Sequence, residues 1–129
     1  MAKILIIDDD GQLRQILQQL LTSSGHAVTT AHDGADGLRR FRAEPADLII
    51  TDVFMPDQDG LGTILALRRE FPGVRIIAIS GRESRSPNWL TVAARLGATR
   101  TLANPFTVGQ LTEAIADVLA ARADPVGQA

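Results

Sequence analysis

Acidic residues follow the ends of two hydrophobic runs in this sequence. Residues 3–7 (KILII) are followed by Asp8, Asp9 and Asp10, and residues 47–51 (DLIIT) are followed by Asp52. Burying or crowding carboxylates costs several kcal/mol unless a positive charge lies among them. Two such run ends in one chain suggest a shared site for a divalent cation, with one carboxylate left free for chemistry.

Strand-like and helix-like segments alternate five times, and these elements must position the acids. The predicted strands are residues 3–7, 27–31, 47–51, 74–79 and 99–103. Three of them are nearly continuous Ile, Leu and Val, which is typical of strands covered on both faces in a parallel sheet. The pattern predicts a (βα)5 domain of the α/β class with one sheet.

Apolar residues at helical spacing mark the segments between these strands. In the first predicted helix the apolar stripe consists of Leu13, Ile16, Leu17, Leu20 and Leu21, and Asp10 is placed as the N-cap. Similar stripes within residues 35–41, 61–67, 89–96 and 111–119 predict four more helices. Glycines at 25, 73 and 97 lie where helices are expected to end.

Composition limits the classes of protein to which the chain can belong. Its 129 residues are 45% hydrophobic and 22% charged, which is typical of one globular domain. Neither a membrane span nor a signal peptide is evident, and with no cysteine the chain fits the cytoplasm. The net charge of −2 gives no reason to expect nucleic acid binding. We predict a domain over residues 1–122 and a short flexible tail over residues 123–129.

The strand order decides whether the acids meet. Ligands of open α/β sheets bind beyond the carboxyl ends of the strands, where the strand order reverses. If the order is the flavodoxin-like 2-1-3-4-5, the first and third strands are neighbours, and Asp8, Asp9 and Asp52 converge. Mg²⁺ prefers such oxygen ligands and keeps several waters. One carboxylate oxygen then remains available as a nucleophile toward phosphorus.

With these features the chain resembles the receiver domain of two-component response regulators, over roughly residues 2–122. The matching segments are residues 6–10 (IIDDD), 52–60 (DVFMPDQDG), 79–81 (ISG) and 104–106 (NPF). Each segment alone is a weak signal, whereas their order and spacing together are specific. The resemblance implies a three-layer flavodoxin-like sandwich in which a parallel five-stranded sheet has the order 2-1-3-4-5.

The resemblance also implies roles for individual residues. Asp52 is expected to accept a phosphoryl group from a histidine of a sensor kinase or phosphotransfer protein. Asp9, Asp52 and the main-chain carbonyl of Phe54 are expected to bind Mg²⁺ directly, and Asp8 through water. Ser80 is expected to hydrogen-bond a phosphoryl oxygen. A downstream protein partner is expected on the face of the fourth and fifth helices.

Two positions depart from the family pattern. Receivers nearly always carry lysine immediately before the proline of the last matching segment, whereas this chain has Asn104. Asparagine is uncharged, so a charge-assisted contact is lost, and Lys3 belongs at the opposite edge of the sheet. Thr101 replaces the usual aromatic reporter of activation. We hypothesise that Arg82, two residues after Ser80, supplies some of the missing charge; the alternative is that it only solvates a loop.

Three classes of function remain open. The preferred one is a phosphorylatable receiver that is not an enzyme and stands alone, because no effector domain follows residue 122. The alternative is a phosphorylation-independent interaction module, which Asn104 and Thr101 favour. A phosphohydrolase is the third, but Phe54 occupies the place of its usual second aspartate.

The exposed side of the first helix, with Gln12, Arg14 and Gln15, is the expected docking surface for the kinase. The two histidines, at 26 and 32, are expected to be isolated surface residues.

Overall fold

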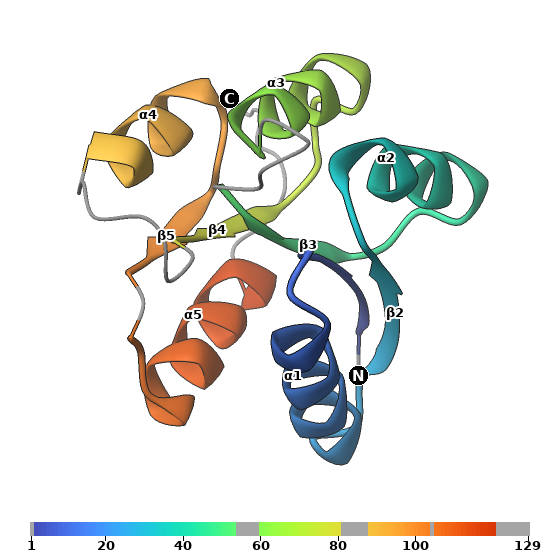
Figure 1. The fold of residues 1–129 in the computed structure, drawn as a ribbon, viewed down its shortest axis with the longest axis vertical. Coiled ribbons are helices and arrows are strands. Elements are labelled where there is room, and N and C mark those ends of the chain that lie inside the picture. Colours follow the sequence, from blue (N-terminus) through green and yellow to red (C-terminus); the bar gives the residue numbers. More distant parts are fainter. Residues whose placement is uncertain (1, 54–59, 81–87, 104, 121–129) are drawn as a thin grey trace.

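A parallel sheet runs through the middle of the molecule, with helices on both of its faces (Figure 1). The computed structural model describes residues 2–53, 60–80, 88–103 and 105–120. Along them the elements are β1 (Lys3–Ile7), α1 (Gly11–Ser23), β2 (Ala27–Ala31), α2 (Gly34–Ala43), β3 (Leu48–Asp52), α3 (Gly60–Glu70), β4 (Ile76–Ile79), α4 (Asn88–Leu96), β5 (Arg100–Leu102) and α5 (Val108–Ala120).

The sheet has the order β2-β1-β3-β4-β5 with every pair parallel, as predicted. Three strands have bounds that differ from the prediction. β3 extends to Asp52, because this residue pairs with Ile79 of β4. β4 begins only at Ile76, since Val74 donates its N–H to the carbonyl of Phe71 in the preceding turn (2.9 Å). β5 is shorter than predicted and spans Arg100–Leu102.

Alternate strand residues form two hydrophobic cores, one on each face of the sheet. On one face Ile4, Ile6 and Ile50 pack with residues of α1 and α5. On the other face Leu5 and Ile49 pack with residues of α2, α3 and α4. Figure 1 shows the corresponding layers, with α1 and α5 below the sheet and the other three helices above it. Burial on both faces explains why β1, β3 and β4 read as continuous apolar runs.

The apolar stripe of α1 is wider than the surface it buries. Leu17 and Leu21 are buried, and Leu13 and Leu20 pack against the same core more loosely. Ile16 was predicted to belong to this stripe, but it is 58% exposed because the sheet contacts only the other side of the helix.

Helix ends follow the capping residues that the sequence predicts. Asp10 caps α1, its Oδ1 accepting the N–H groups of Gln12 (3.0 Å) and Leu13 (3.2 Å). Gly25 and Gly97 have positive φ angles (95° and 133°), which glycine adopts without strain where the chain leaves α1 and α4.

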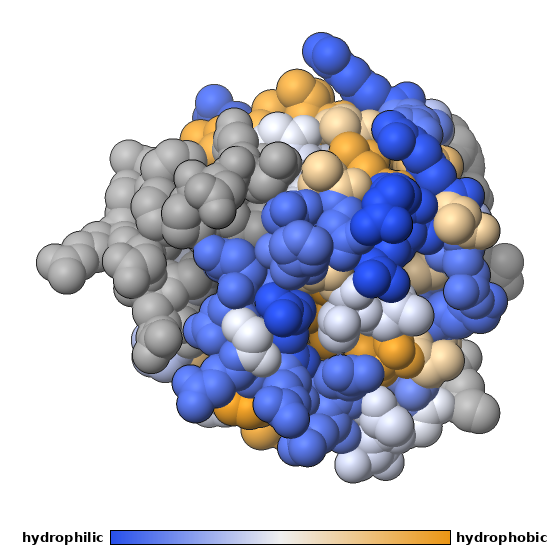
Figure 2. Space-filling model, turned by 45° about the vertical axis from the view of Figure 1, so that its right-hand side comes forward, coloured by the Kyte–Doolittle hydropathy of each residue, from blue (hydrophilic) through white to orange (hydrophobic). Residues whose placement is uncertain are grey.

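The side of the molecule formed around the edge strand β2 is polar. Exposed and half-exposed residues alternate along β2, among them Thr29 and Thr30. Figure 2, turned to bring this side forward, shows a mainly hydrophilic surface with small apolar patches. No helix within the described part of the chain is long and apolar enough to cross a membrane.

We predict that Gly37→Ala destabilises the fold. Gly37 of α2 lies against the buried side chain of Ile7, and an added Cβ would meet Ile7 Cγ1 at 2.8 Å. This overpacking should lower the free energy of unfolding by about 1–3 kcal/mol, although alanine favours helix. The matched control is Gly109→Ala in α5, where the nearest atom lies 3.8 Å away and we expect no loss. Urea denaturation measures both; a Gly37→Ala protein as stable as the wild type would contradict the expected clash.

Candidate functional site

The carboxylates predicted to converge do converge. Asp8, Asp9 and Asp52 each offer an oxygen, and these oxygens lie within 4.8 Å of one another. The register explains the meeting, because Ile7 of β1 pairs with Thr51 of β3 and the acids are the next residues on each strand. Like charges at this distance repel strongly in a site partly removed from water.

Burial and neighbouring charges disfavour the ionised form of Asp8. Its side chain is fully buried; Oδ1 accepts the N–H of Asp10 (2.9 Å), while Oδ2 has no hydrogen-bond partner among the described residues. Burial raises the pKa of Asp8 to about 7, and the charges of Asp52, Asp9 and Asp10 act in the same direction. The hydrogen bond from Asp10 opposes the rise only in part. Without a cation nearby, the ionised form of Asp8 is therefore disfavoured.

Asp52 and Asp9 differ in their access to solvent. Asp52 ends β3 and is 4% exposed, and the hydroxyl of Thr51 donates to its main-chain carbonyl (3.1 Å). Asp9 is exposed. A ligand therefore reaches the cluster from the side of Asp9, while strand pairing holds Asp52 in place.

The residues of the cluster fit a hard divalent cation. Three carboxylates supply the oxygen ligands that Mg²⁺ prefers, and the unpartnered Oδ2 of Asp8 is the kind of atom that a hydrated cation would satisfy. The fourth predicted donor, the carbonyl of Phe54, lies outside the described residues, as do Asn104 and Arg82.

Ser80 follows β4 at the same edge of the sheet. It comes after Ile79, which pairs with Asp52, and its N–H donates to the carbonyl of Leu102 (3.1 Å). Ser80 is 7% exposed, so its environment is nearly as enclosed as that of Asp52. Thr101 is half-buried in β5, where it pairs with Ala78.

Arg14 also lies at this edge of the sheet, although the sequence analysis assigned it to a docking surface. It was assigned to an exposed docking surface with Gln12 and Gln15, and both glutamines are exposed. Arg14, however, is half-buried, and its Nη1 donates to the main-chain carbonyl of Asp8 (2.7 Å). The sequence signal that could have placed Arg14 at this edge is its position, one turn into the helix that follows the acids.

The two histidines are not isolated. His32 follows β2 beside Asp8, and its ring nitrogens lie 3.3 Å from carboxylate oxygens of Asp33 and Asp36, although the side chain is 66% exposed. His26 is half-buried, and its Nδ1 accepts the main-chain N–H of Ala2 (3.1 Å).

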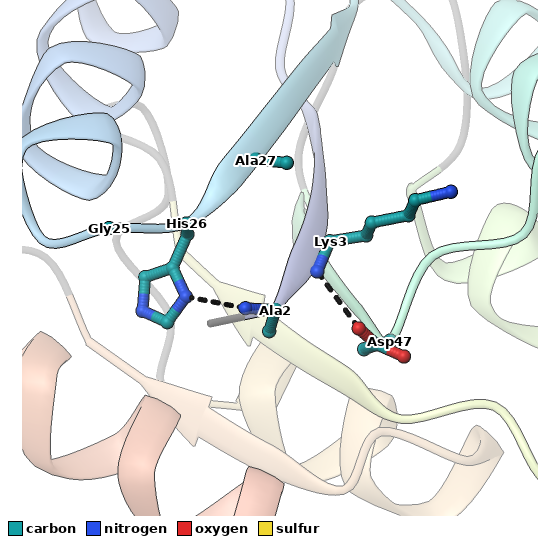
Figure 3. Close-up of a pocket in the computed structure, with 6 residues that line it drawn as sticks. All are labelled: Ala2, Lys3, Gly25, His26, Ala27 and Asp47. Carbon is teal, nitrogen blue, oxygen red and sulfur yellow. Dashed lines mark hydrogen bonds between the residues drawn. The ribbon is translucent and has the colours of Figure 1, made fainter.

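Two shallow hollows lie away from the acidic cluster, at the amino edge of the sheet. Figure 3 shows the smaller one, of about 390 Å³, where the Lys3 main-chain N–H donates to Asp47 Oδ2 (2.9 Å). The other, of about 470 Å³, lies between the ends of α2 and α3 and is lined in part by Phe41 and Phe71. Lys3 is paired with Glu44 (2.9 Å), which agrees with the expectation that this lysine cannot serve the acids.

The sequence and the fold of this chain both match known proteins. The sequence model of the response regulator receiver domain matches residues 4–116. Among curated relatives, the transcriptional regulatory protein GlrR of Escherichia coli is 35% identical over 92% of this chain and 26% of its own length. The DNA-binding transcriptional regulator NtrC of Azospirillum brasilense is 35% identical over 96% of this chain and 25% of its own length. The chain thus spans about a quarter of the length of these relatives.

Solved structures of similar size also match. A receiver domain protein from Clostridium thermocellum superimposes with a TM-score of 0.84 at 30% identity, covering 92% of this chain and 94% of the other. The chemotaxis protein CheY4 of Vibrio cholerae superimposes with a TM-score of 0.83 at 31% identity, covering 92% and 98%. Together with the family match over residues 4–116 and the β2-β1-β3-β4-β5 sheet, these likenesses identify the chain as a member of the response regulator receiver domain family of two-component signalling.

Proposed function

We propose that the chain is a phosphorylatable receiver, in which Asp52 accepts a phosphoryl group from a phosphohistidine and the domain signals by a change of conformation. The phosphodonor is a sensor histidine kinase or a histidine phosphotransfer protein. The observation that carries this proposal is the convergence of Asp8, Asp9 and Asp52 within 4.8 Å at one edge of the sheet.

The proposed reaction is a transfer between two nucleophiles. A carboxylate oxygen of Asp52 attacks phosphorus and forms an O–P bond, and the N–P bond to the donor imidazole breaks. The bonding electron pair goes to the ring nitrogen, and a proton on the other ring nitrogen of the donor keeps the departing imidazole neutral, so the products are neutral histidine and an aspartyl phosphate. Enclosure of Asp52, which is 4% exposed, supports the reaction by limiting competing water.

Mg²⁺ is the proposed cofactor of this transfer. Asp8, Asp9 and Asp52 would hold it, together with the main-chain carbonyl of Phe54 that the family resemblance implies. When bound, it supplies the positive charge that offsets the carboxylates and the incoming phosphoryl group. The hydroxyl of Ser80 is proposed to donate to a phosphoryl oxygen, as its enclosed position beside β3 supports.

The alternative is a receiver that works as an interaction module without phosphorylation. Asn104 and Thr101 favour it, because the usual lysine and aromatic residue are missing. Against it stands the cost of keeping three mutually repelling acids, one of them fully buried, in a chain that does not use them. We propose no enzymatic turnover for this chain, since Phe54 stands where a phosphohydrolase would carry its general acid.

A protein partner on the face of α4 and α5 is the proposed route of output. Val92 of α4 and Val108 of α5 are 39% and 60% exposed, so each of these helices offers an apolar side chain to a protein surface. We propose that the receiver itself contacts proteins and not nucleic acid; the net charge of −2 supports this.

Phosphorylation of Asp52 can be tested directly by intact mass. We expect one added phosphoryl group after incubation with acetyl phosphate and Mg²⁺, because acetyl phosphate supplies the same phosphoryl group to the same nucleophile. The addition should be lost in Asp52→Asn and in the presence of a chelator. Asp47→Asn is the matched control, since Asp47 precedes the same strand at the opposite edge of the sheet.

Persistence of the added mass in Asp52→Asn would place the reaction at another residue. If the wild type gains no mass and beryllofluoride causes no spectral change, the phosphorylation-independent module becomes the better account.

A further prediction concerns the free energy of unfolding that the fold loses by burying the Asp8 carboxylate. The pKa of Asp8 is raised from 3.8 to about 7, so the folded state holds this proton more tightly than the unfolded state. The resulting contribution to stability is fully present below about pH 4 and is lost as the pH rises through about 7. Asp8→Asn keeps an acceptor for the Asp10 N–H and removes the charge. Without metal it should raise the free energy of unfolding at pH 8 by on the order of 1–3 kcal/mol.

Thermal and urea unfolding, followed by circular dichroism in EDTA and in millimolar Mg²⁺, measure this effect. The gain should shrink at pH 4, and Mg²⁺ should stabilise the wild type much more than Asp8→Asn. Equal stability of the two proteins in EDTA at pH 8 would contradict the assigned strain at Asp8.

A further inference from the structure

We infer that Arg14 is a positioning residue for the acidic cluster: it fixes the peptide that joins Asp8 to Asp9, and so holds both carboxylates in the arrangement that binds a divalent cation. The inference deepens the proposed function and rests on it, since it assigns a role toward the proposed Mg²⁺ site. Arg14 lies on α1, outside the predicted set of site residues.

Arg14 is tied to the acidic segment at two points. Its main-chain N–H donates to the carbonyl of Asp10 (3.0 Å), and its guanidinium donates through Nη1 to the carbonyl of Asp8 (2.7 Å). The segment is closed on itself by the Asp10 N–H, which donates to Oδ1 of Asp8 (2.9 Å). The first turn of α1 and the end of β1 are thereby linked by three hydrogen bonds around the acids.

The carbonyl of Asp8 is an effective point from which to orient both acids. It belongs to the planar peptide unit that also contains the N–H of Asp9. A hydrogen bond to this carbonyl therefore restrains the plane that joins the Cα atoms of Asp8 and Asp9. Asp8 Oδ1 is held by a separate hydrogen bond, whereas the side chain of Asp9 is exposed. The hydrogen bond from Arg14 to this peptide therefore helps to direct the Asp9 carboxylate toward Asp8 and Asp52.

The charge of Arg14 makes a second, opposing contribution. The guanidinium carries a positive charge, and this charge repels a cation that approaches the cluster. As a spectator charge, Arg14 would weaken Mg²⁺ binding and its removal would tighten it. As a positioning residue, its removal loosens the ligands and weakens binding. The sign of the change in Mg²⁺ affinity therefore separates the two roles.

The test is calorimetric titration of the metal-free protein with Mg²⁺, for the wild type, Arg14→Ala, Arg14→Gln and Arg14→Lys. We expect Mg²⁺ affinity to fall about 3- to 10-fold in the first two variants. Arg14→Lys should lose less, because ammonium can still donate to the Asp8 carbonyl. Arg69→Ala is the matched control; it removes an exposed arginine from α3 and should leave the affinity unchanged.

Circular dichroism and unfolding in EDTA show which variants are folded. If Arg14→Ala does not fold, Arg14→Gln and Arg14→Lys decide the question. Unchanged or tighter Mg²⁺ binding in a folded variant overturns the positioning role and leaves the proposed function intact. Absence of Mg²⁺ binding by the wild type itself overturns the proposed metal site and this inference with it.

A kinetic measurement supports the same distinction. When the intact-mass assay is repeated over a range of Mg²⁺ concentrations, Arg14→Gln should need about 3- to 10-fold more Mg²⁺ for half-maximal phosphorylation and then approach the wild-type rate. A lowered rate at saturating Mg²⁺ with an unchanged Mg²⁺ requirement would contradict positioning of the metal ligands.

Discussion

Repulsion among three carboxylates at one edge of the sheet is the constraint on which the rest of the structure depends. Asp8, Asp9 and Asp52 lie within 4.8 Å of one another, and burial raises the pKa of Asp8 to about 7. The fold must supply enough stability elsewhere to tolerate them. The continuous apolar strands β1, β3 and β4, covered on both faces by helices, are where that stability is concentrated.

The same strands that supply stability also set the geometry of the site. Parallel pairing brings the carboxyl ends of β1 and β3 to one edge, and the register from Ile7 to Thr51 places the acids side by side. A slip of one residue would turn every side chain of a strand to the other face of the sheet, and would move the acids out of this register. Strand pairing therefore holds Asp52, and α1 constrains the remaining acids through Asp10 and Arg14.

Most of the fold and the acidic cluster could be predicted from sequence, because both depend on periodic or strongly local signals. The strands were readable as apolar runs, and Asp10 as a cap before helical spacing. Ile16 belongs to the predicted apolar stripe of α1 and yet is exposed, since periodicity shows that a side is apolar but not how much of it finds a partner. Arg14 was wrongly placed on an exposed surface, because the direction of a long flexible side chain depends on tertiary contacts such as the Asp8 carbonyl.

The replacement of the usual lysine by Asn104 changes the electrostatic balance of this site in a definite direction. Without that cation, the proposed Mg²⁺ would have to offset most of the negative charge of the cluster, with a smaller contribution from Arg14. Arg14 binds a neutral carbonyl and not a carboxylate, so it orients the site more than it neutralises it. A receiver built in this way should depend more heavily on its metal than one that carries the lysine. In the proposed phosphorylation of Asp52, the acids that would hold Mg²⁺, rather than a lysine side chain, would then be the main determinants of the reaction.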